Sequence, residues 1–327
     1  MSPADDGGFV FPGREAGEAH DYWRRINRSI GGARTVSAIV VSYFTGPRLR
    51  DCLHVLRADN DIDEIIVVNN GNPAEDTQWL ESFCARTFDA SLVTPNRNLG
   101  FAAGCNLGAQ RAGGDRFLFI NPDALLRPGS VAALEAASVG LSEPWIVGGR
   151  IYFEDGREQR GGRRATLTLW SAFVSYFGLS RLERFHSSFR DVHRENDPLP
   201  DGPVSMPAVS GAMMYMSRRG FERLRGFDEA YFLHVEDIDV CRRAREAWGG
   251  DVVFTPAAGA LHYGSTSKVS SAVVDGAKAR GLSIYFKKFA RNRRERLTSY
   301  LFAHVFEALL MTRSYVLTKI KPASGRG

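Results

Sequence analysis

Four short apolar runs alternate with helix-like segments between residues 35 and 120, and this alternation restricts the fold more than any other feature of the sequence. The runs are rich in Val, Ile, Leu or Phe and span 35–44, 63–72, 91–95 and 116–120. Runs of this length bounded by Asn, Gly or Pro predict buried strands. The segments between them have helical character, such as the Leu spacing at 49, 53 and 56. The pattern predicts an α/β fold with a mostly parallel sheet flanked by helices.

Polar or turn-forming residues follow the end of every predicted strand. They are Tyr43-Phe44, Asn69-Asn70-Gly71, Asn96-Arg97-Asn98 and Asn121-Pro122-Asp123. Ligands of parallel α/β sheets bind at the carboxyl ends of the strands. These four turns therefore form the predicted binding edge.

The remainder of the chain divides by composition. Residues 154–204 are polar and basic with little periodicity, which predicts long loops or an inserted helix that contacts substrate. Apolar order returns at 209–232, and a helix at 234–250 and a strand leading to His262 follow. Residues 1–32 are expected to be a loose extension without a signal peptide, and no segment is expected to span a membrane. The four scattered cysteines favour core packing in a reducing compartment over a zinc or redox site.

Charge is unevenly distributed along the chain. From Lys278 onward there are twelve Lys or Arg and two acids, a net charge of +10. Because the whole chain has a net charge of +5, the residues before Lys278 carry about −5. Residues 285–321 are basic first and then amphipathic, with Leu297, Leu301, Val305 and Leu309 on one helical stripe. We expect a helix that binds an anionic membrane surface; packing on the catalytic domain or in a homodimer interface is the alternative. Nucleic-acid binding is disfavoured, because the body of the chain is acidic.

Several motifs have binding or catalytic chemistry, and each also has a structural explanation. Asp123 follows a buried strand and can hold a divalent cation, with His262 as a second ligand, or it simply ends the strand. The glycine-bearing loop at 96–106 can bring backbone N–H groups to a phosphate, or it relieves helix packing. The acids at 236–239 can supply a general base, or they favour the helix macrodipole.

Taken in order, the motifs resemble the inverting glycosyltransferase family 2, which has the GT-A fold. The resemblance extends from Thr35 to Ser267, and its "NRNLGFAAG", "NPD" and "FDE…ED" segments are most similar to the bacterial rhamnosyltransferase-like branch. The six motifs that carry it are "VVSYF", "IVVNNGN", "NRNLGFAAGCN", "FINPD", "GFDEAYFLHVEDIDVCRR" and "HYGSTS". It implies a Rossmann-like nucleotide-diphospho-sugar transferase domain over 33–277, with a donor-binding half at 33–125, an acceptor-binding and catalytic half at 126–277, and a helical extension over 278–327.

The resemblance also implies roles for individual residues. Asp237 would be the catalytic base with Glu236 beside it, and Asp123 and His262 would bind Mg²⁺ or Mn²⁺. Asn121 and Asn69 stand where many family members have an acid. Gly211, Ala212 and Trp170 would contact the acceptor. The donor contacts would come from Ser42, Tyr43, Asn69, Asn70, Gly71, Asn96, Arg97, Asn98, Gly100, Phe101, Gly104, Asn106 and Asn121.

The implied activity is hexosyl transfer from a nucleoside diphosphate sugar. The resemblance points to dTDP-L-rhamnose as donor and to a lipid-linked or polysaccharide acceptor in cell-envelope glycan synthesis. The alternatives are a UDP-hexose donor, a nucleotidyltransferase and an inactive sugar-binding homologue. The expected location is cytoplasmic, at the inner face of the cell membrane.

Overall fold

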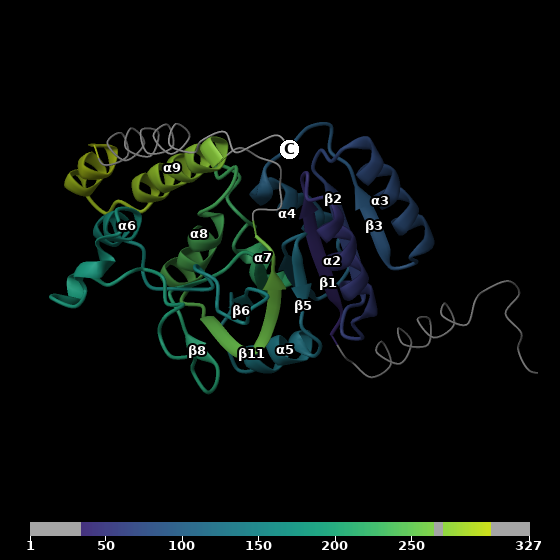
Figure 1. Cartoon of the computed structure of the whole chain (residues 1–327), viewed down its shortest axis with the longest axis horizontal. Helices are drawn as coiled ribbons and strands as arrows, with labels where there is room; N and C mark the ends of the chain where they lie inside the picture. The colour runs from purple at the N-terminus through teal and green to yellow at the C-terminus, as the bar shows by residue number, and fades with distance from the viewer. Residues whose placement is uncertain (1–33, 265–270, 302–327) are drawn as a thin grey trace, which may run out of the picture.

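A nine-stranded mixed sheet crosses the molecule and is flanked by helices (Figure 1). The computed structural model describes residues 34–264 and 271–301, so the predicted extension at 1–32 and the tail beyond residue 301 lie outside the described residues. The strand order is β3-β2-β1-β4-β10-β6-β11-β5, and β8 pairs with β11 at the side.

The first half of the domain is the predicted alternation of strands and helices. Its elements are β1 (Val36–Ser42), α2 (Pro47–Ala58), β2 (Glu64–Asn69), α3 (Ala74–Arg86), β3 (Ala90–Val93), α4 (Phe101–Arg111) and β4 (Arg116–Ile120). The pairs β1–β2, β1–β4 and β2–β3 are all parallel. The four predicted strands are confirmed, and the turns after β1, β2 and β4 lie at one edge of the sheet.

The second half makes the sheet mixed. Its main elements are β5 (Ala124–Leu126), α5 (Ser130–Ser138), β6 (Ile146–Tyr152), β8 (Val204–Ser205), β10 (Met213–Ser217), α7 (Arg218–Arg223), α8 (Glu236–Arg242) and β11 (Val252–His262). Strand β10 lies antiparallel between β4 and β6. Its amino end therefore meets the carboxyl end of β4, which brings the chain before β10 to the predicted binding edge.

Helix α4 packs unusually close to the sheet. A Cβ atom on Gly104 would lie 2.7 Å from a methyl group of Val41, and one on Gly108 would lie 2.6 Å from Ile39. Both distances are shorter than real Cβ contacts. The glycines are therefore explained by helix–sheet packing, the structural alternative for this segment.

Residues 154–204 contain only short elements, as the composition indicated. They are β7 (Arg163–Arg164), which pairs with β9 (Ala208–Val209), then α6 (Leu169–Tyr176), η1 (Leu179–Leu182) and η2 (Ser187–Phe189). A second, smaller core joins this region to α8 and to α9 (Ser271–Lys288), with Leu282 and Tyr285 buried in it. The boundary expected after residue 277 falls inside α9. Within the described ranges, no helix is long and apolar enough to cross a membrane.

Candidate active site

Asp123 and His262 lie together at the carboxyl edge of the sheet. Strand β5 pairs antiparallel with β11 so that His262 is opposite Ala124, the residue after Asp123. His262 Nε2 is consequently 3.1 Å from Asp123 Oδ1, and both side chains are largely buried. The two residues singled out as candidate metal ligands therefore share one site.

Gln159 fixes the orientation of His262. Its amide Nε2 donates to the His262 backbone carbonyl, which turns Gln159 Oε1 toward the ring, 2.8 Å from His262 Nδ1. Gln159 Oε1 can only accept, so His262 Nδ1 donates to it. His262 Nε2 faces Asp123 Oδ1 and the Asn121 amide nitrogen, each 3.1 Å away. Sequence inspection missed Gln159, because a glutamine in a polar segment has no distinctive spacing.

The arrangement fits a divalent cation. A carboxylate oxygen and an imidazole nitrogen 3.1 Å apart are held together by a proton on the nitrogen or by a cation between them. Neighbouring ligands of an octahedral ion with bonds of about 2.1 Å are separated by about 3 Å, which matches this pair. Among the described residues, no three His, Cys, Asp or Glu side chains form a metal-holding group. Donor oxygens would therefore have to complete the coordination.

The asparagines of the predicted donor edge build the turns. Asn69 Oδ1 accepts from Asn72, and its Nδ2 donates to Thr77. Asn70 Nδ2 donates to Asn98 Oδ1 and to the Gly100 carbonyl, and its Oδ1 accepts from the Leu99 N–H. These amides hold the loop that leads to α4. These hydrogen bonds alone explain the presence of asparagine at these positions, without a contact to the nucleotide sugar.

Asn106 and Gly100 also have structural roles. Asn106 Nδ2 donates to the Phe227 carbonyl and to Glu229, and its Oδ1 accepts from the Phe227 N–H. Gly100 has a φ of +82°, and a Cβ there would meet the Phe232 carbonyl at 2.4 Å. The Phe101 N–H donates to that same carbonyl, 2.8 Å away. Helix α4 is thus anchored to the segment before α8.

The remaining predicted donor residues surround the same edge. Ser42 is buried and donates to Asn72 Oδ1 at 3.1 Å. Gly71 has a φ of +111° and packs against the Tyr43 ring, which is partly exposed. Asn96 and Arg97 are exposed in the loop before α4. Tyr43, Asn96 and Arg97 are therefore the members of this set best exposed to contact a bound nucleotide.

Two buried carboxylates begin α8 and have opposite pKa shifts. Burial and the adjacent Asp237 charge raise the pKa of Glu236 to about 8, and Glu236 Oε2 has no hydrogen-bond partner among the described residues. Burial alone would raise the pKa of Asp237, but Arg164, 2.8 Å away, and the Gly211 N–H outweigh it and lower the pKa. At neutral pH Asp237 is therefore ionised and Glu236 is protonated.

A short chain of contacts connects Asp237 to the Asp123 turn. The Gly211 N–H donates to Asp237 Oδ2 at 3.0 Å, and the next residue, Ala212, accepts at its carbonyl from the Asn121 N–H, also at 3.0 Å. Gly211 and Ala212 thus place the general-base candidate beside the metal-site candidate. Arg164 is a second residue that sequence inspection did not single out.

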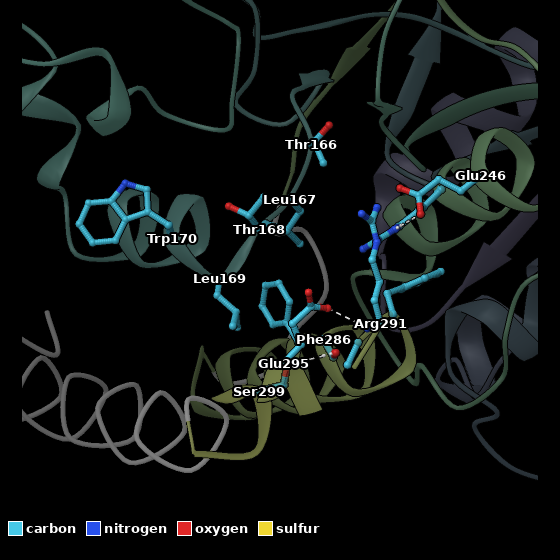
Figure 2. Close-up of a pocket in the computed structure, with 13 residues that line it drawn as sticks. Thr166, Leu167, Thr168, Leu169, Trp170, Glu246, Phe286, Arg291, Glu295 and Ser299 are labelled. Carbon is cyan, nitrogen blue, oxygen red and sulfur yellow. Dashed lines mark hydrogen bonds and ion pairs between the residues drawn. The ribbon is translucent and has the colours of Figure 1, made fainter. Parts of the chain in front are cut away.

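Trp170 lies elsewhere. It is 46% exposed and lines a cavity of about 410 Å³ between the start of α6 and the end of α9 (Figure 2). Asp237 does not line this cavity; it lines a larger one of about 790 Å³ on the other side of Leu167. The structure therefore separates Trp170 from the other predicted acceptor residues.

Comparison with known proteins shows what the chain is similar to. Residues 37–195 match the family model described as glycosyl transferase family 2. The chain contains a glycosyl transferase family 2 domain. The chain is 24% identical over 237 residues to an N-acetylglucosaminyl-diphospho-decaprenol L-rhamnosyltransferase of Mycobacterium tuberculosis, a match that covers 69% of this chain and 75% of the relative. It is 25% identical over 239 residues to the rhamnosyltransferase WbbL of Escherichia coli, covering 70% and 83%.

Solved structures confirm the GT-A fold. GalNAc-T7 with UDP, GalNAc and Mn²⁺ matches with a TM-score of 0.56 at 15% identity, over 88% of this chain and 58% of that one. The mannosyltransferase PcManGT of Pyrobaculum calidifontis with GDP-Man and Mn²⁺ matches with a TM-score of 0.54 at 14% identity, over 95% and 86%. The chain is a glycosyltransferase with rhamnosyltransferase homologues at low identity.

Proposed function

We propose that the chain is a metal-dependent inverting glycosyltransferase that transfers a sugar, best assigned as L-rhamnose from dTDP-L-rhamnose, to a lipid-linked or polysaccharide acceptor. The observation that carries this proposal is the convergence of the Asp123–His262 pair and the ionised Asp237 at one edge of the sheet. Two structural matches hold Mn²⁺ and a nucleotide, which supports a divalent cation here. The rhamnosyltransferase relatives support the donor and a place in envelope glycan synthesis.

The residues support a single displacement. Asp123 Oδ1 and His262 Nε2 would hold Mg²⁺ or Mn²⁺, which neutralises the leaving diphosphate when it is bound. Asp237 would accept the proton of an acceptor hydroxyl while that oxygen bonds to the anomeric carbon and the sugar–phosphate bond breaks on the opposite face. One displacement inverts the anomeric centre. Glu236, protonated at neutral pH, keeps a second negative charge away from Asp237.

The tail supports attachment to a membrane surface. Residues 293–301 are helical, and within them Leu297 and Leu301 of the predicted stripe are 60% and 56% exposed. An exposed apolar stripe beside basic residues is typical of helices that lie on anionic lipid. Flotation with anionic and neutral vesicles, comparing the full chain with one ending at Ala290, tests this attachment. Equal flotation of both chains would disprove a role for the tail.

The reaction type is tested by the product. We would incubate the protein with dTDP-L-rhamnose or a UDP-hexose, an acceptor extract and Mn²⁺, and identify the released phosphate species. Glycosyl transfer releases the nucleoside diphosphate, whereas a nucleotidyltransferase releases pyrophosphate. Asp237→Asn should abolish release, and release that persists in this variant would argue against Asp237 as the base.

A further inference from the structure

The cavity beside Asp237 has a basic wall that the proposed sugar transfer does not explain. It measures about 790 Å³ and lies between the segment from β7 to η1, the start of α8, and α9. Four cationic side chains line it, namely Arg160, Arg164, Arg181 and Lys278. Asp237 and Asp275 line it as well. The cations come from β7, η1, α9 and the turn before β7, so they converge from separate parts of the chain.

Two of these cations are paired and two are not. Arg164 contacts Asp237 at 2.8 Å, and Arg160 contacts Asp191 at 2.9 Å. Within the described ranges, neither Lys278 nor Arg181 has a carboxylate within ion-pair distance. Burial and the charge of Arg164 lower the pKa of Lys278, and the opposing charges of Asp275 and Asp237 do not outweigh them. Four cations face two carboxylates in this lining, so the cavity has positive charge in excess, and a bound anion would favour the charged form of Lys278.

The rim of the cavity is apolar and aromatic. Phe177 lines the cavity and is 38% exposed, and the Phe173 ring connects it to Trp170 along α6, with centroid distances of 4.6 and 5.9 Å. Leu182 and Phe185, just beyond Arg181 in the chain, are 37% and 70% exposed. A ligand that fits both the basic wall and the apolar rim has an anionic group inside the cavity and an apolar chain that leaves it across α6. Arginine and lysine together favour a phosphate over a single carboxylate as that group.

We propose that this cavity binds the phosphate groups of a phosphate-linked lipid acceptor, with Lys278 and Arg181 as the phosphate-binding residues and the lipid chain leaving past Phe177. Asp237 lines the same cavity, so a sugar attached to that phosphate would lie beside the proposed base. This inference rests on the proposed function, since it names the acceptor class of the same site.

Calorimetry with geranyl diphosphate as the probe tests the proposal. EDTA is present throughout, so that the Asp123–His262 site lacks the cation it would need to hold a diphosphate. We expect Lys278→Gln and Arg181→Gln each to weaken binding by about tenfold or more, the usual effect of removing one charge-assisted hydrogen bond. Arg184→Gln is the matched control, because Arg184 stacks on Phe185 without lining the cavity. Arg181 is exposed, so its variant should fold even if the Lys278 variant does not.

Two further ligands identify the chemistry. Geraniol should not bind, and inorganic pyrophosphate should bind more weakly than geranyl diphosphate. Unchanged binding in both cavity variants, equal binding of geraniol, or equal binding of pyrophosphate would overturn the proposal. Binding of dTDP with Mn²⁺ is measured on the same proteins. If dTDP fails to bind while geranyl diphosphate binding depends on Lys278, the donor assignment is wrong and the phosphate cavity stands. If the cavity variants lose dTDP equally, the effect is not local and the cavity assignment fails.

Discussion

Replacing Glu236 with Gln should remove a large pH dependence from the stability of the protein. The pKa of Glu236 is raised from 4.5 to about 8 in the folded chain, because burial and Asp237 disfavour its charged form. Below pH 4.5 Glu236 is protonated in both the folded and the unfolded chain, and its contribution to the free energy of unfolding is at its maximum. As the pH rises from 4.5 to 8, the unfolded chain releases the proton while the folded chain keeps it, so stability falls.

The expected size follows from the shift. Each pH unit within this window costs about 1.4 kcal/mol, so the free energy of unfolding should fall by at most about 3 kcal/mol between pH 5.5 and 8 through this one group. Gln cannot ionise, so Glu236→Gln lacks this slope. Other titrating groups, including His193 and His234 with their lowered pKa values, act on both proteins and cancel in the difference.

Urea unfolding of the two proteins at pH 5.5, 6.5, 7.5 and 8.5 measures the effect. The stability of Glu236→Gln relative to wild type should rise steadily with pH. Glu81→Gln, an exposed acid on α3, is the control and should follow wild type at every pH. Parallel curves for wild type and Glu236→Gln would show that Glu236 is ionised in the folded protein, and our division of roles between the two carboxylates would be wrong.

Three other substitutions test separate parts of the account. Asp237→Asn should reduce transfer about 100- to 10,000-fold in kcat, the usual share of a general base, while Glu236→Gln keeps most of its kcat below pH 8. Gln159→Leu should weaken Mn²⁺ binding in the presence of dTDP by about 10- to 100-fold, measured by electron paramagnetic resonance, because His262 loses the partner that orients it; unchanged binding would contradict that role. Gly108→Ala should destabilise the protein by about 1–3 kcal/mol through overpacking on Ile39. Its control, Gly276→Ala in helix α9, would place the new Cβ no closer than 4.0 Å to the Arg280 side chain and should be neutral or stabilising in the same urea experiment.

Local patterns predicted the first half of the fold because its strands are continuous apolar runs. The segment 116–120 matches β4, and the run at 63–72 contains β2. Strand β10 was harder to place, since an apolar run such as Met213–Ser217 does not show which strands it joins or in which direction. Its antiparallel position between β4 and β6 depends on contacts far apart in the sequence. Sheet order is therefore the part of the fold that these patterns left open.

The candidate site shows the same division. Asp123 and His262 could be singled out because each follows a strand with the right chemistry, and the pairing of β5 with β11 brings them together. Asn70 was singled out for the same reason and Asn106 through the family resemblance, yet their amides hold loops and helix α4. A polar residue after a strand serves a turn as readily as a ligand, and only its partners distinguish the two. Gln159 and Arg164 were missed because their roles depend on distant residues.

Thermal unfolding with nucleotides shows whether Asp123 holds a metal-bound donor. Wild type, Asp123→Ala and the control Asp155→Ala, an exposed acid, are heated with dTDP, UDP or GDP, each with Mn²⁺ and with EDTA. Because a ligand that binds only the folded chain raises the melting temperature, one nucleotide should raise it in wild type and in Asp155→Ala, with Mn²⁺ only. Asp123→Ala should show no shift. A shift that needs no metal, or that persists in Asp123→Ala, would contradict a metal-held donor at this edge of the sheet.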